Sequence, residues 1–322
     1  MINGAEGARG AVGAVAAALE ERVAGSVERD ASSAALTTYR CGGPVAVLVR
    51  VEREHDFDEV APVLVAHADV PVLVIGRGSN LLIADRGFAG VAIVLAGELE
   101  RIDVDPGRAR VDAGGAAPLP VLARQAAKAG IGGLEFYVGI PGSVGGALRM
   151  NAGGHGAQTE DVVVSARVLD LRDGRTRRLG VEELELGYRR SALGARDVVL
   201  GAGFAGFEDD PVVCDRRIDE IVRWRREHQP GGQNAGSVFT NPPGDTAGRL
   251  IDSCGLKGLR VGGVVVSEKH ANFFAASPGA RADDVLALVR LVQSRVEAET
   301  GVRLDPELQL VGFADASEEV GG

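Results

Sequence analysis

Two glycine-rich segments contain the residues best suited to bind a ligand. The first, Gly76-Arg77-Gly78-Ser79-Asn80, follows an apolar run that ends at Ile75. The second has seven glycines in the eighteen residues from Gly139 to Gly156, in a chain with 46 glycines in 322 residues. Glycine adopts positive φ without steric cost and lets backbone N–H groups approach a ligand closely. Because such N–H groups bind anions, the two segments predict a cofactor with a diphosphate.

The spacing within these segments does not match the common nucleotide motifs. Leu81 stands where the dinucleotide fingerprint needs its third glycine, and no P-loop sequence Gly-Lys-Ser/Thr follows. For the first segment alone, a tight turn after a strand is the alternative interpretation. A second loop, 142–146, and the intervening pair Gly114-Gly115 favour a cofactor instead. We expect the loops to hold that cofactor from two sides.

Short strands and helices must position these loops. Apolar runs and turn residues predict a first α+β domain that ends near residue 205. Its expected strands are 45–51, 70–75, 91–95, 109–111, 162–171 and 197–204, and its expected helices are 57–66 and 119–129.

The pattern changes at Asp209-Asp210-Pro211, after which helices and strands alternate. The expected helices are 214–228, 245–254 and 283–299, and the expected strands are 261–266, 272–275 and 308–313. The last strand could return to the first domain. The stretch 11–19 is followed at once by charged residues, so it favours an amphipathic helix or frayed extension over a signal peptide.

Composition limits the class of protein. Aromatic residues are only 4% of a chain that is 45% apolar, so the core must consist mainly of Val, Leu, Ile and Ala. A net charge of −10 without a basic block argues against nucleic acid as a partner. No apolar run approaches the roughly 18 residues of a membrane span. Cys41, Cys214 and Cys254 lack Cys-x-x-Cys spacing and indicate reduced thiols in a cytoplasmic protein.

Four ordered segments carry a resemblance to a known family. They are 75–82, 139–146 with Asn151, Gly187-Tyr-Arg-Arg-Ser191, and 234–242 with the sequence Asn-Ala-Gly-Ser-Val-Phe-Thr-Asn-Pro. Together they resemble UDP-N-acetylenolpyruvoylglucosamine reductases, the FAD enzymes that complete UDP-N-acetylmuramate in peptidoglycan synthesis. The resemblance runs from about Leu36 to Phe313. Each motif alone is weak, but the ordered set is specific.

The resemblance implies an α+β fold with two domains. One is an FAD-binding domain of the vanillyl-alcohol-oxidase (PCMH) type, and the other is a smaller α+β substrate-binding domain. The implied division is an N-terminal extension at 1–35, the FAD-binding domain at 36–205, the substrate-binding domain at 206–306, and a C-terminal strand and tail at 307–322 that returns to the first domain.

The resemblance also implies non-covalent FAD, with NADPH as co-substrate. Some relatives attach flavin through a histidine in the first loop, and this loop has none. His155 is better interpreted as a solvated loop residue than as a covalent flavin link. No metal is expected. The implied FAD-binding residues are Gly76, Arg77, Gly78, Ser79, Asn80, Leu81, Gly114, Gly139, Ile140, Pro141, Gly142, Gly145, Gly146 and Asn151.

Three residues match the family's catalytic positions. Ser237 matches the proton donor, Arg189 the arginine that polarises the substrate, and Glu307 the catalytic glutamate near the C-terminus. Without the resemblance, each has an ordinary interpretation as a turn serine, a surface arginine and a turn acid beside Pro306. Their chemistry suits reduction of an enolpyruvyl ether, which needs a hydride at one carbon and a proton at the next.

The implied substrate is UDP-N-acetylglucosamine enolpyruvate, bound by a monomeric enzyme. Many relatives have a lysine where this chain has His228, so this chain departs from the family pattern at the implied diphosphate contact. The short segment between Gly255 and Val261 indicates the shorter-loop type, with a more open substrate cleft. The implied substrate-binding residues are Tyr188, Arg225, His228, Asn241, Lys257, His270 and Asn272.

Two other functions compete with the reductase. Another flavoprotein oxidase or dehydrogenase of the same superfamily would be reduced by its own substrate without NADPH. A non-catalytic nucleotide-binding protein would keep the loops without the chemistry. The Ser237 segment and Glu307 argue against the oxidase.

Overall fold

The computed structural model describes residues 3–23 and 25–313, in two compact units. The first unit comprises residues 1–31, 45–77 and 89–223, and the second comprises 32–44, 78–88 and 224–322. This division differs from the consecutive domains 36–205 and 206–306 that we expected. Two short segments of the N-terminal half belong with the C-terminal part, and the Gly76–Asn80 loop changes unit after Arg77.

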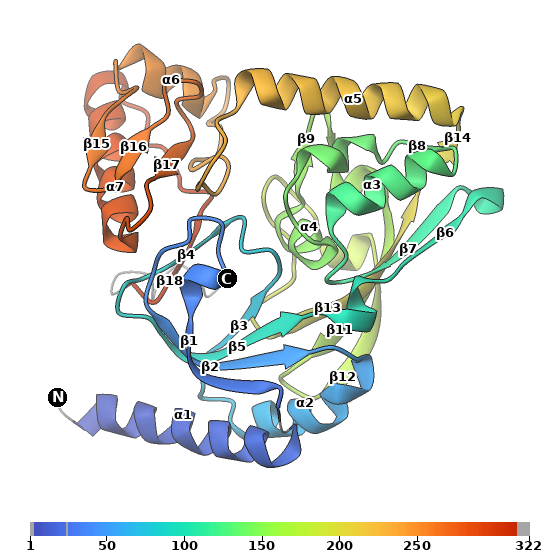
Figure 1. Cartoon of the computed structure of the whole chain (residues 1–322), viewed down its shortest axis with the longest axis vertical. Coiled ribbons are helices and arrows are strands. Elements are labelled where there is room, and N and C mark those ends of the chain that lie inside the picture. The colour runs from blue at the N-terminus through green and yellow to red at the C-terminus, as the bar shows by residue number, and fades with distance from the viewer. Residues whose placement is uncertain (1–2, 24, 314–322) are drawn as a thin grey trace. The chain divides into compact units, whose positions relative to one another are not determined.

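A mixed sheet in the first unit supports the N-terminal helices (Figure 1). Its strand order is β1 (Val27–Ser32), β2 (Pro44–Val51), β5 (Phe88–Leu95) and β3 (Val72–Ile75), with β3 parallel to β5. Helix α1 (Asn3–Arg22) packs against α2 (Phe57–Ala66). Val15 and Leu19 of α1 are fully buried in the same core as Leu64 of α2. The helix expected near the N-terminus is therefore confirmed.

The second sheet of this unit is antiparallel and has a core on each face. Its order is β12 (Arg175–Gly180), β11 (Val163–Asp170), β13 (Asp197–Ala205), β7 (Arg110–Gly114) and β6 (Ile102–Asp105). Because side chains alternate along a strand, Val199 enters one core whereas Val198 and Leu200 enter the other. Phe204 joins the core of Val199 because the register with β11 shifts between these residues. The first of these cores also contains helices α3 (Leu119–Lys128) and α4 (Val144–Met150).

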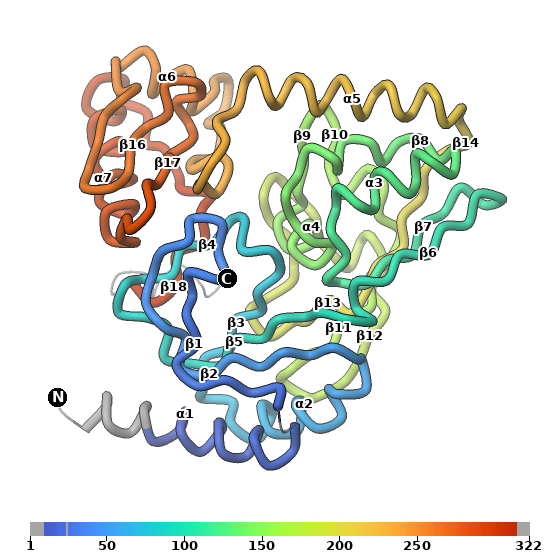
Figure 2. Tube along the Cα trace, viewed as in Figure 1, coloured from blue at the N-terminus to red at the C-terminus, as the bar shows by residue number. Residues whose placement is uncertain are grey.

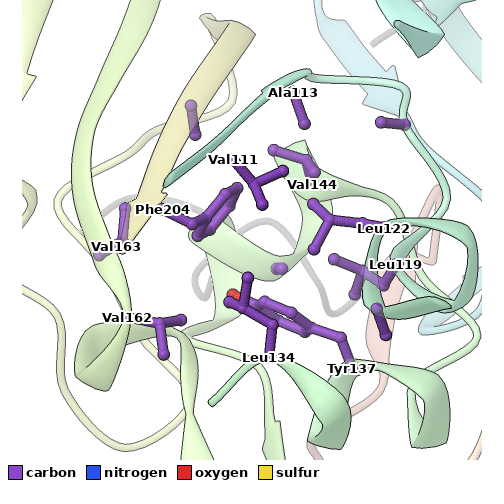
Figure 3. Packing of buried hydrophobic residues seen from close by; sticks show 14 of the residues in the cluster. Val111, Ala113, Leu119, Leu122, Leu134, Tyr137, Val144, Val162, Val163 and Phe204 are labelled. Atoms are coloured by element: carbon purple, nitrogen blue, oxygen red, sulfur yellow. The ribbon is translucent and has the colours of Figure 1, made fainter. Parts of the chain in front are cut away.

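A buried aromatic pair fixes the start of the long glycine loop (Figure 3). Tyr137 lies in the 3-10 turn Glu135–Gly139, and its ring makes an edge contact with Phe204 at a centroid distance of 5.7 Å. The Tyr137 hydroxyl donates to the hydroxyl of Thr159 over 3.2 Å. The loop that begins at Gly139 therefore starts from a rigid point in the core. Two short ladders complete this unit: β8 (Ile131–Gly132) with β14 (Phe207–Glu208), and β9 (Gly153–Gly154) with β10 (Ala157–Gln158).

The second unit is built around helix α7 (Ala282–Thr300), which buries Val285, Leu288 and Val292 and ends before Gly301, where φ is +72°. Helix α5 (Pro211–His228) enters this unit from the first. The remaining elements are α6 (Ala247–Ser253), β15 (Arg260–Val261), β16 (Val264–Val266), β17 (Phe274–Ala276), β4 (Leu81–Ile83) and β18 (Gln309–Val311).

The structure changes two expected strands. The strand predicted at 261–266 is two strands, because Gly262 takes a positive φ of +51° and turns the chain back. The C-terminal strand, β18, pairs in parallel with β4, so the two lie side by side in the trace of Figure 2. Strand β4 lies within the range 36–205 expected for the first domain, but it belongs to the second compact unit, so β18 pairs with a strand of that unit. The expected tail at 314–322 lies outside the described residues. Within those residues, no helix has the length and apolarity needed to cross a membrane.

Candidate functional site

The Gly139–Gly146 loop is fastened to the first unit by its own backbone. The N–H of Val144 donates to Ala117 O over 3.0 Å, and that of Gly145 donates to Gly115 O over 2.8 Å. The N–H of Gly146 donates to the hydroxyl of Ser143, at 3.5 Å. The N–H groups of Gly145 and Gly146 therefore have partners within the protein, and the expected contact of these glycines with the cofactor stays a prediction. Gly145 is better explained by packing, because a Cβ there would lie 3.2 Å from Gly115 O.

Gly76 lies against Ser143 of the long glycine loop. A Cβ on Gly76 would lie 2.3 Å from the Ser143 hydroxyl, and Ser143 is itself buried. A Cβ on Gly114 would lie 2.0 Å from Leu99 O. A side chain at either glycine would therefore collide with its neighbour. The close approach of Gly76 to the Gly139–Gly146 loop agrees with the expected grouping of the loops.

The Gly76–Asn80 loop has the open backbone donors that the longer loop lacks. Within the described residues, no hydrogen bond uses the N–H groups from Arg77 to Asn80. Gly78 is held in place because its carbonyl accepts from Thr38 N over 3.1 Å. It must be glycine, since its φ is +61° and a Cβ would lie 1.9 Å from Leu36 O. A row of unpaired N–H groups on a fixed loop suits a diphosphate.

A set of buried hydroxyl groups in the segment 33–39, whose residues 36–38 contact Gly78, was not predicted from the sequence. Ser33, Thr37 and Tyr39 are buried, and their hydroxyls have no hydrogen-bond partner among the described residues. Burial raises the pKa of Tyr39, so its hydroxyl stays protonated. Buried polar groups without partners are costly, and a bound polar ligand would satisfy them. The sequence signal was the run of hydroxyl residues before Gly42-Gly43, which is too common to identify a site.

Arg189 lies on a short loop in the first unit. Gly187 and Arg190 exchange two backbone hydrogen bonds of 3.1 Å, and Arg189 between them has a φ of +56°. The guanidinium of Arg189 donates to the carbonyls of Asn151 and Gly153 over 3.4 and 3.3 Å. The neighbouring Tyr188 is 53% exposed, and its ring centre is 5.1 Å from the guanidinium carbon. Arg189 is thus an oriented cation rather than an ordinary surface arginine.

Asn151 is fully buried, and its carboxamide is engaged within the protein. The amide nitrogen donates to Gly187 O over 3.1 Å and to the Glu160 carboxylate over 3.4 Å. The carbonyl oxygen accepts from Glu160 N over 3.0 Å. The carboxamide of Asn151 thus contacts the Arg189 loop and Glu160, and the expected contact of Asn151 with the cofactor stays a prediction.

In the second unit, the chain brings the segments of Ser237 and Glu307 together. Ser237 forms a β-bridge with Phe273, and Glu307 N donates to Val238 O over 2.8 Å. The segment that contains Ser237 therefore lies between two other segments of the unit. The amide of Asn80 donates to Glu307 O over 3.0 Å, which links the cofactor loop to the same arrangement. Both Ser237 and Glu307 are half-buried.

Asn272 supports this arrangement from within. Its amide donates to Phe239 O over 2.8 Å, and its carbonyl oxygen accepts from Phe239 N over 3.0 Å. It is only 3% exposed. The side chain of Asn272 therefore holds the segment that follows Ser237, and the expectation that Asn272 also binds substrate stays a prediction.

Three residues expected to bind substrate, His228, Lys257 and His270, lie close enough in the second unit to interact electrostatically. Burial lowers the pKa of His270, and the positive charges of Lys257 and His228 lower it further. Lys257 forms an ion pair with Asp252 at 2.7 Å, so part of its charge is offset. The His228 ring stacks on Trp224 at a centroid distance of 4.6 Å. This cluster suits an anion better than any of its members alone.

The two remaining expected ligands differ in how much of each side chain is open to solvent. Arg225 is half-buried, donates to Gln229 over 2.8 Å, and has a pKa lowered by burial. Asn241 is exposed, and its carbonyl oxygen accepts from Ala247 N over 3.0 Å at the start of α6. Asn241 therefore also fastens the loop to a helix.

Comparison with known proteins agrees with this geometry. The model for an FAD binding domain matches residues 45–180, and the model for the C-terminal domain of UDP-N-acetylenolpyruvoylglucosamine reductase matches residues 228–311. A reductase of that name from Caulobacter vibrioides is 43% identical over 288 residues, which cover 88% of this chain and 94% of the relative. The chain belongs to the UDP-N-acetylenolpyruvoylglucosamine reductase family.

Other members of the family support the same assignment. A reductase from Paramagnetospirillum magneticum is 44% identical over 299 residues, which cover 92% of this chain and 95% of the relative. The crystal structure of the reductase from Thermus caldophilus matches with a TM-score of 0.75 and 38% identity, covering 88% of this chain and 98% of that one. The predicted resemblance, the α+β fold with an FAD-binding domain, and FAD as the cofactor are thereby confirmed.

The residues of this chain fit the FAD of the family. The open N–H groups of Arg77 to Asn80 would hold its diphosphate, and the unpartnered hydroxyls of Thr37 and Tyr39 offer polar contacts beside them. The Gly76–Asn80 loop has no histidine, which agrees with non-covalent binding.

Proposed function

We propose that this chain uses NADPH to reduce UDP-N-acetylglucosamine enolpyruvate to UDP-N-acetylmuramate, a step of peptidoglycan precursor synthesis. The observation that carries the proposal is the hydrogen-bonded arrangement of the second unit. It joins Asn80 of the cofactor loop, Glu307 and the segment of Ser237. Family membership supports the same reaction.

The proposed mechanism assigns the chain's own residues to proton transfer and charge stabilisation. Bound FAD, once reduced by NADPH, supplies the hydride. Ser237 gives its hydroxyl proton to the neighbouring carbon of the substrate. A serine hydroxyl is a weak acid, so it can protonate only a strongly basic carbon, such as that of an enolate.

Arg189 and Glu307 act on the charge that develops in this step. The planar fork of Arg189 matches the substrate carboxylate, onto which the negative charge of the enolate spreads. The bonds of Arg189 to Asn151 O and Gly153 O support this orientation before substrate binds. We assign Glu307 to the enolpyruvyl part of the substrate because its backbone is bonded to the residue after Ser237.

The substrate's diphosphate is assigned to the cations of the second unit. The proposed contacts to the diphosphate are the side chains of Arg225, His228, Lys257 and His270. Tyr188 and Asn241 are proposed as further substrate contacts. Because Lys257 is paired with Asp252 and burial lowers the pKa of His270, we assign the largest contribution to Arg225, whose guanidinium is always charged.

An anaerobic absorption experiment tests the proposal. The purified holoenzyme is titrated first with NADPH and then with UDP-N-acetylglucosamine enolpyruvate. NADPH should bleach the flavin absorption, and the substrate should restore it with formation of UDP-N-acetylmuramate. A flavin that the substrate fails to reoxidise would contradict the proposal.

The same experiment separates the two competing functions. An oxidase would be reduced by its own substrate without NADPH and reoxidised rapidly by oxygen. A non-catalytic protein would bind nucleotide without turnover. The proposed monomeric state and cytoplasmic location stay predictions, which size-exclusion chromatography and cell fractionation would check.

A further inference from the structure

The buried carboxamide of Asn151 links the end of helix α4 to the loop that carries Arg189. Asn151 follows the last residue of α4 and has a φ of +40°, in the left-handed region. Its amide nitrogen donates to Gly187 O over 3.1 Å. Gly187 in turn exchanges two backbone bonds with Arg190, which close the turn around Arg189. Only one residue therefore separates the Asn151 contact from the proposed catalytic cation.

A helix cap alone does not account for this residue. Glycine fills a left-handed position after a helix at least as well as asparagine does. Asn151 is fully buried and makes three side-chain hydrogen bonds, two of them to Glu160. Glu160 is itself held by Gln158, which donates to its carboxylate over 3.1 Å. The bonds to Glu160 therefore fix the orientation of the carboxamide independently of its contact with the loop.

The contact between the two segments is reciprocal. The side chain of Asn151 bonds the backbone of Gly187, and the guanidinium of Arg189 bonds the backbone carbonyl of Asn151 over 3.4 Å. A second anchor lies at Ser191, whose hydroxyl donates to Arg149 O over 2.9 Å. The loop is thus fastened on both sides of Arg189. Arg189 itself has a left-handed backbone, which a residue other than glycine rarely adopts unless its surroundings hold it.

We propose that Asn151 is a positioning residue for Arg189: its carboxamide holds the Gly187–Ser191 loop so that the guanidinium is oriented for the substrate carboxylate. This inference rests on the proposed function of Arg189. It differs from the expected role of Asn151 as a cofactor ligand, because it predicts an effect on one half-reaction only.

The substitution Asn151→Gly tests this inference in the holoenzyme. Glycine keeps the left-handed backbone and removes the carboxamide. Reoxidation of the reduced enzyme by substrate should slow about 10²-fold, since a small misplacement of a catalytic group can cost that much. Reduction by NADPH and the Kd for FAD should stay within about twofold of wild type. A matched control is Ala109→Gly, at another left-handed residue after a helical turn that lies outside this network.

Two further measurements separate positioning from a merely structural role. Hydrogen exchange of the Gly187 and Arg190 amides should quicken in Asn151→Gly and not in Ala109→Gly. The double variant Asn151→Gly with Arg189→Ala should be no slower than Arg189→Ala alone, because each change removes the same contribution, that of the oriented Arg189 guanidinium. If Asn151→Gly does not fold, Asn151→Asp keeps the size and the backbone preference while removing both N–H donors.

Three results would overturn the inference. They are a wild-type rate of reoxidation in Asn151→Gly, a weaker FAD affinity with a normal rate at saturating FAD, and fully additive effects in the double variant. If Arg189→Ala slows reoxidation and Asn151→Gly does not, only this inference fails. If Arg189→Ala has no effect, the proposed role of Arg189 fails together with it.

Discussion

The side-chain amide of Asn80 donates a hydrogen bond to the backbone carbonyl of Glu307, 3.0 Å away. The bond joins residues 227 positions apart in the sequence. The carbonyl of Asn80 also accepts from Gln309 N over 3.0 Å, directly before β4 pairs with β18. The loop with the open N–H donors and the proposed catalytic glutamate therefore belong to one hydrogen-bonded piece of the second unit.

Replacing Asn80 should therefore affect the Glu307 segment. In Asn80→Ala the carbonyl of Glu307 loses a partner within a half-buried site, so the free energy of unfolding should fall by about 1–2 kcal/mol. Chemical denaturation measures this change. Gln309→Ala is the control, because Gln309 contacts the same carbonyl from an exposed position over 3.4 Å. Its effect should stay below about 0.5 kcal/mol. Equal losses in the two variants would contradict the importance of the Asn80 bond.

The cofactor loop should not tolerate a side chain at Gly78. Gly78→Ala places a Cβ 1.9 Å from Leu36 O at a positive φ, which displaces the N–H groups assigned to the diphosphate. The left-handed backbone alone costs about 1–2 kcal/mol. The Kd for FAD, measured by fluorescence titration, should rise at least about tenfold. Gly231→Ala is the control, since a Cβ at Gly231 meets no atom within 4 Å. An unchanged Kd in Gly78→Ala would remove this loop from the FAD site.

The glycine pattern predicted the loops because a glycine in the sequence often marks a position where the backbone has a positive φ or approaches another group closely. Helix 57–66 and the helix that ends before Gly301 were also predicted from local sequence patterns, and both agree with the structure. The assignment of residues 32–44 and 78–88 to the second unit could not be predicted in this way. It depends on pairing between β4 and β18, which are far apart in the chain.

Side-chain roles were harder to predict than loops. An asparagine looks the same in a sequence whether its carboxamide contacts a ligand or the protein's own backbone. Asn151 and Asn272 were both expected to bind ligands, and the carboxamides of both form hydrogen bonds with backbone groups of the protein. The unpartnered hydroxyls of Thr37 and Tyr39 were missed for the converse reason, because burial without a partner is visible only in three dimensions.

The substitution Arg189→Lys should be costly although it preserves the charge. An ammonium group cannot reproduce the planar fork that a carboxylate accepts. Hydrogen bonds to charged groups contribute about 1.5–3 kcal/mol, so substrate reoxidation of the enzyme should slow about 10–100-fold. Stopped-flow absorbance follows this step. The exposed neighbour provides the control, as Arg190→Lys should leave the rate unchanged. If both lysine variants behave alike, Arg189 has no special part in the reaction.

His270 should make the stability of the protein fall on acidification. Its pKa is lowered from 6.5 in the folded state by burial and by the charges of Lys257 and His228. As the pH falls below 6.5, the unfolded chain binds the proton first, so stability decreases until the folded pKa is passed. In His270→Gln, this part of the pH dependence should disappear. Unfolding curves taken above and below pH 6.5 compare the two proteins. A decrease of the same size in both would assign the effect to other groups.

Ser237 is the proposed proton donor in the reduction of UDP-N-acetylglucosamine enolpyruvate. Ser237→Ala should bind FAD and accept electrons from NADPH normally, because the hydroxyl has no part in those steps. Protonation of the substrate should then slow about 10²–10⁴-fold, the usual contribution of a positioned acid. Ser253→Ala serves as the control, since the Ser253 hydroxyl donates to Leu250 O within α6.

The most direct measurement is a single-turnover experiment. Wild type, Ser237→Ala and Ser253→Ala are reduced by NADPH without oxygen and mixed with the substrate, and flavin reoxidation is followed by stopped-flow absorbance. The account predicts fast reoxidation in wild type and Ser253→Ala, and reoxidation about 10²–10⁴-fold slower in Ser237→Ala. Wild-type reoxidation in Ser237→Ala, with normal formation of UDP-N-acetylmuramate, would contradict it.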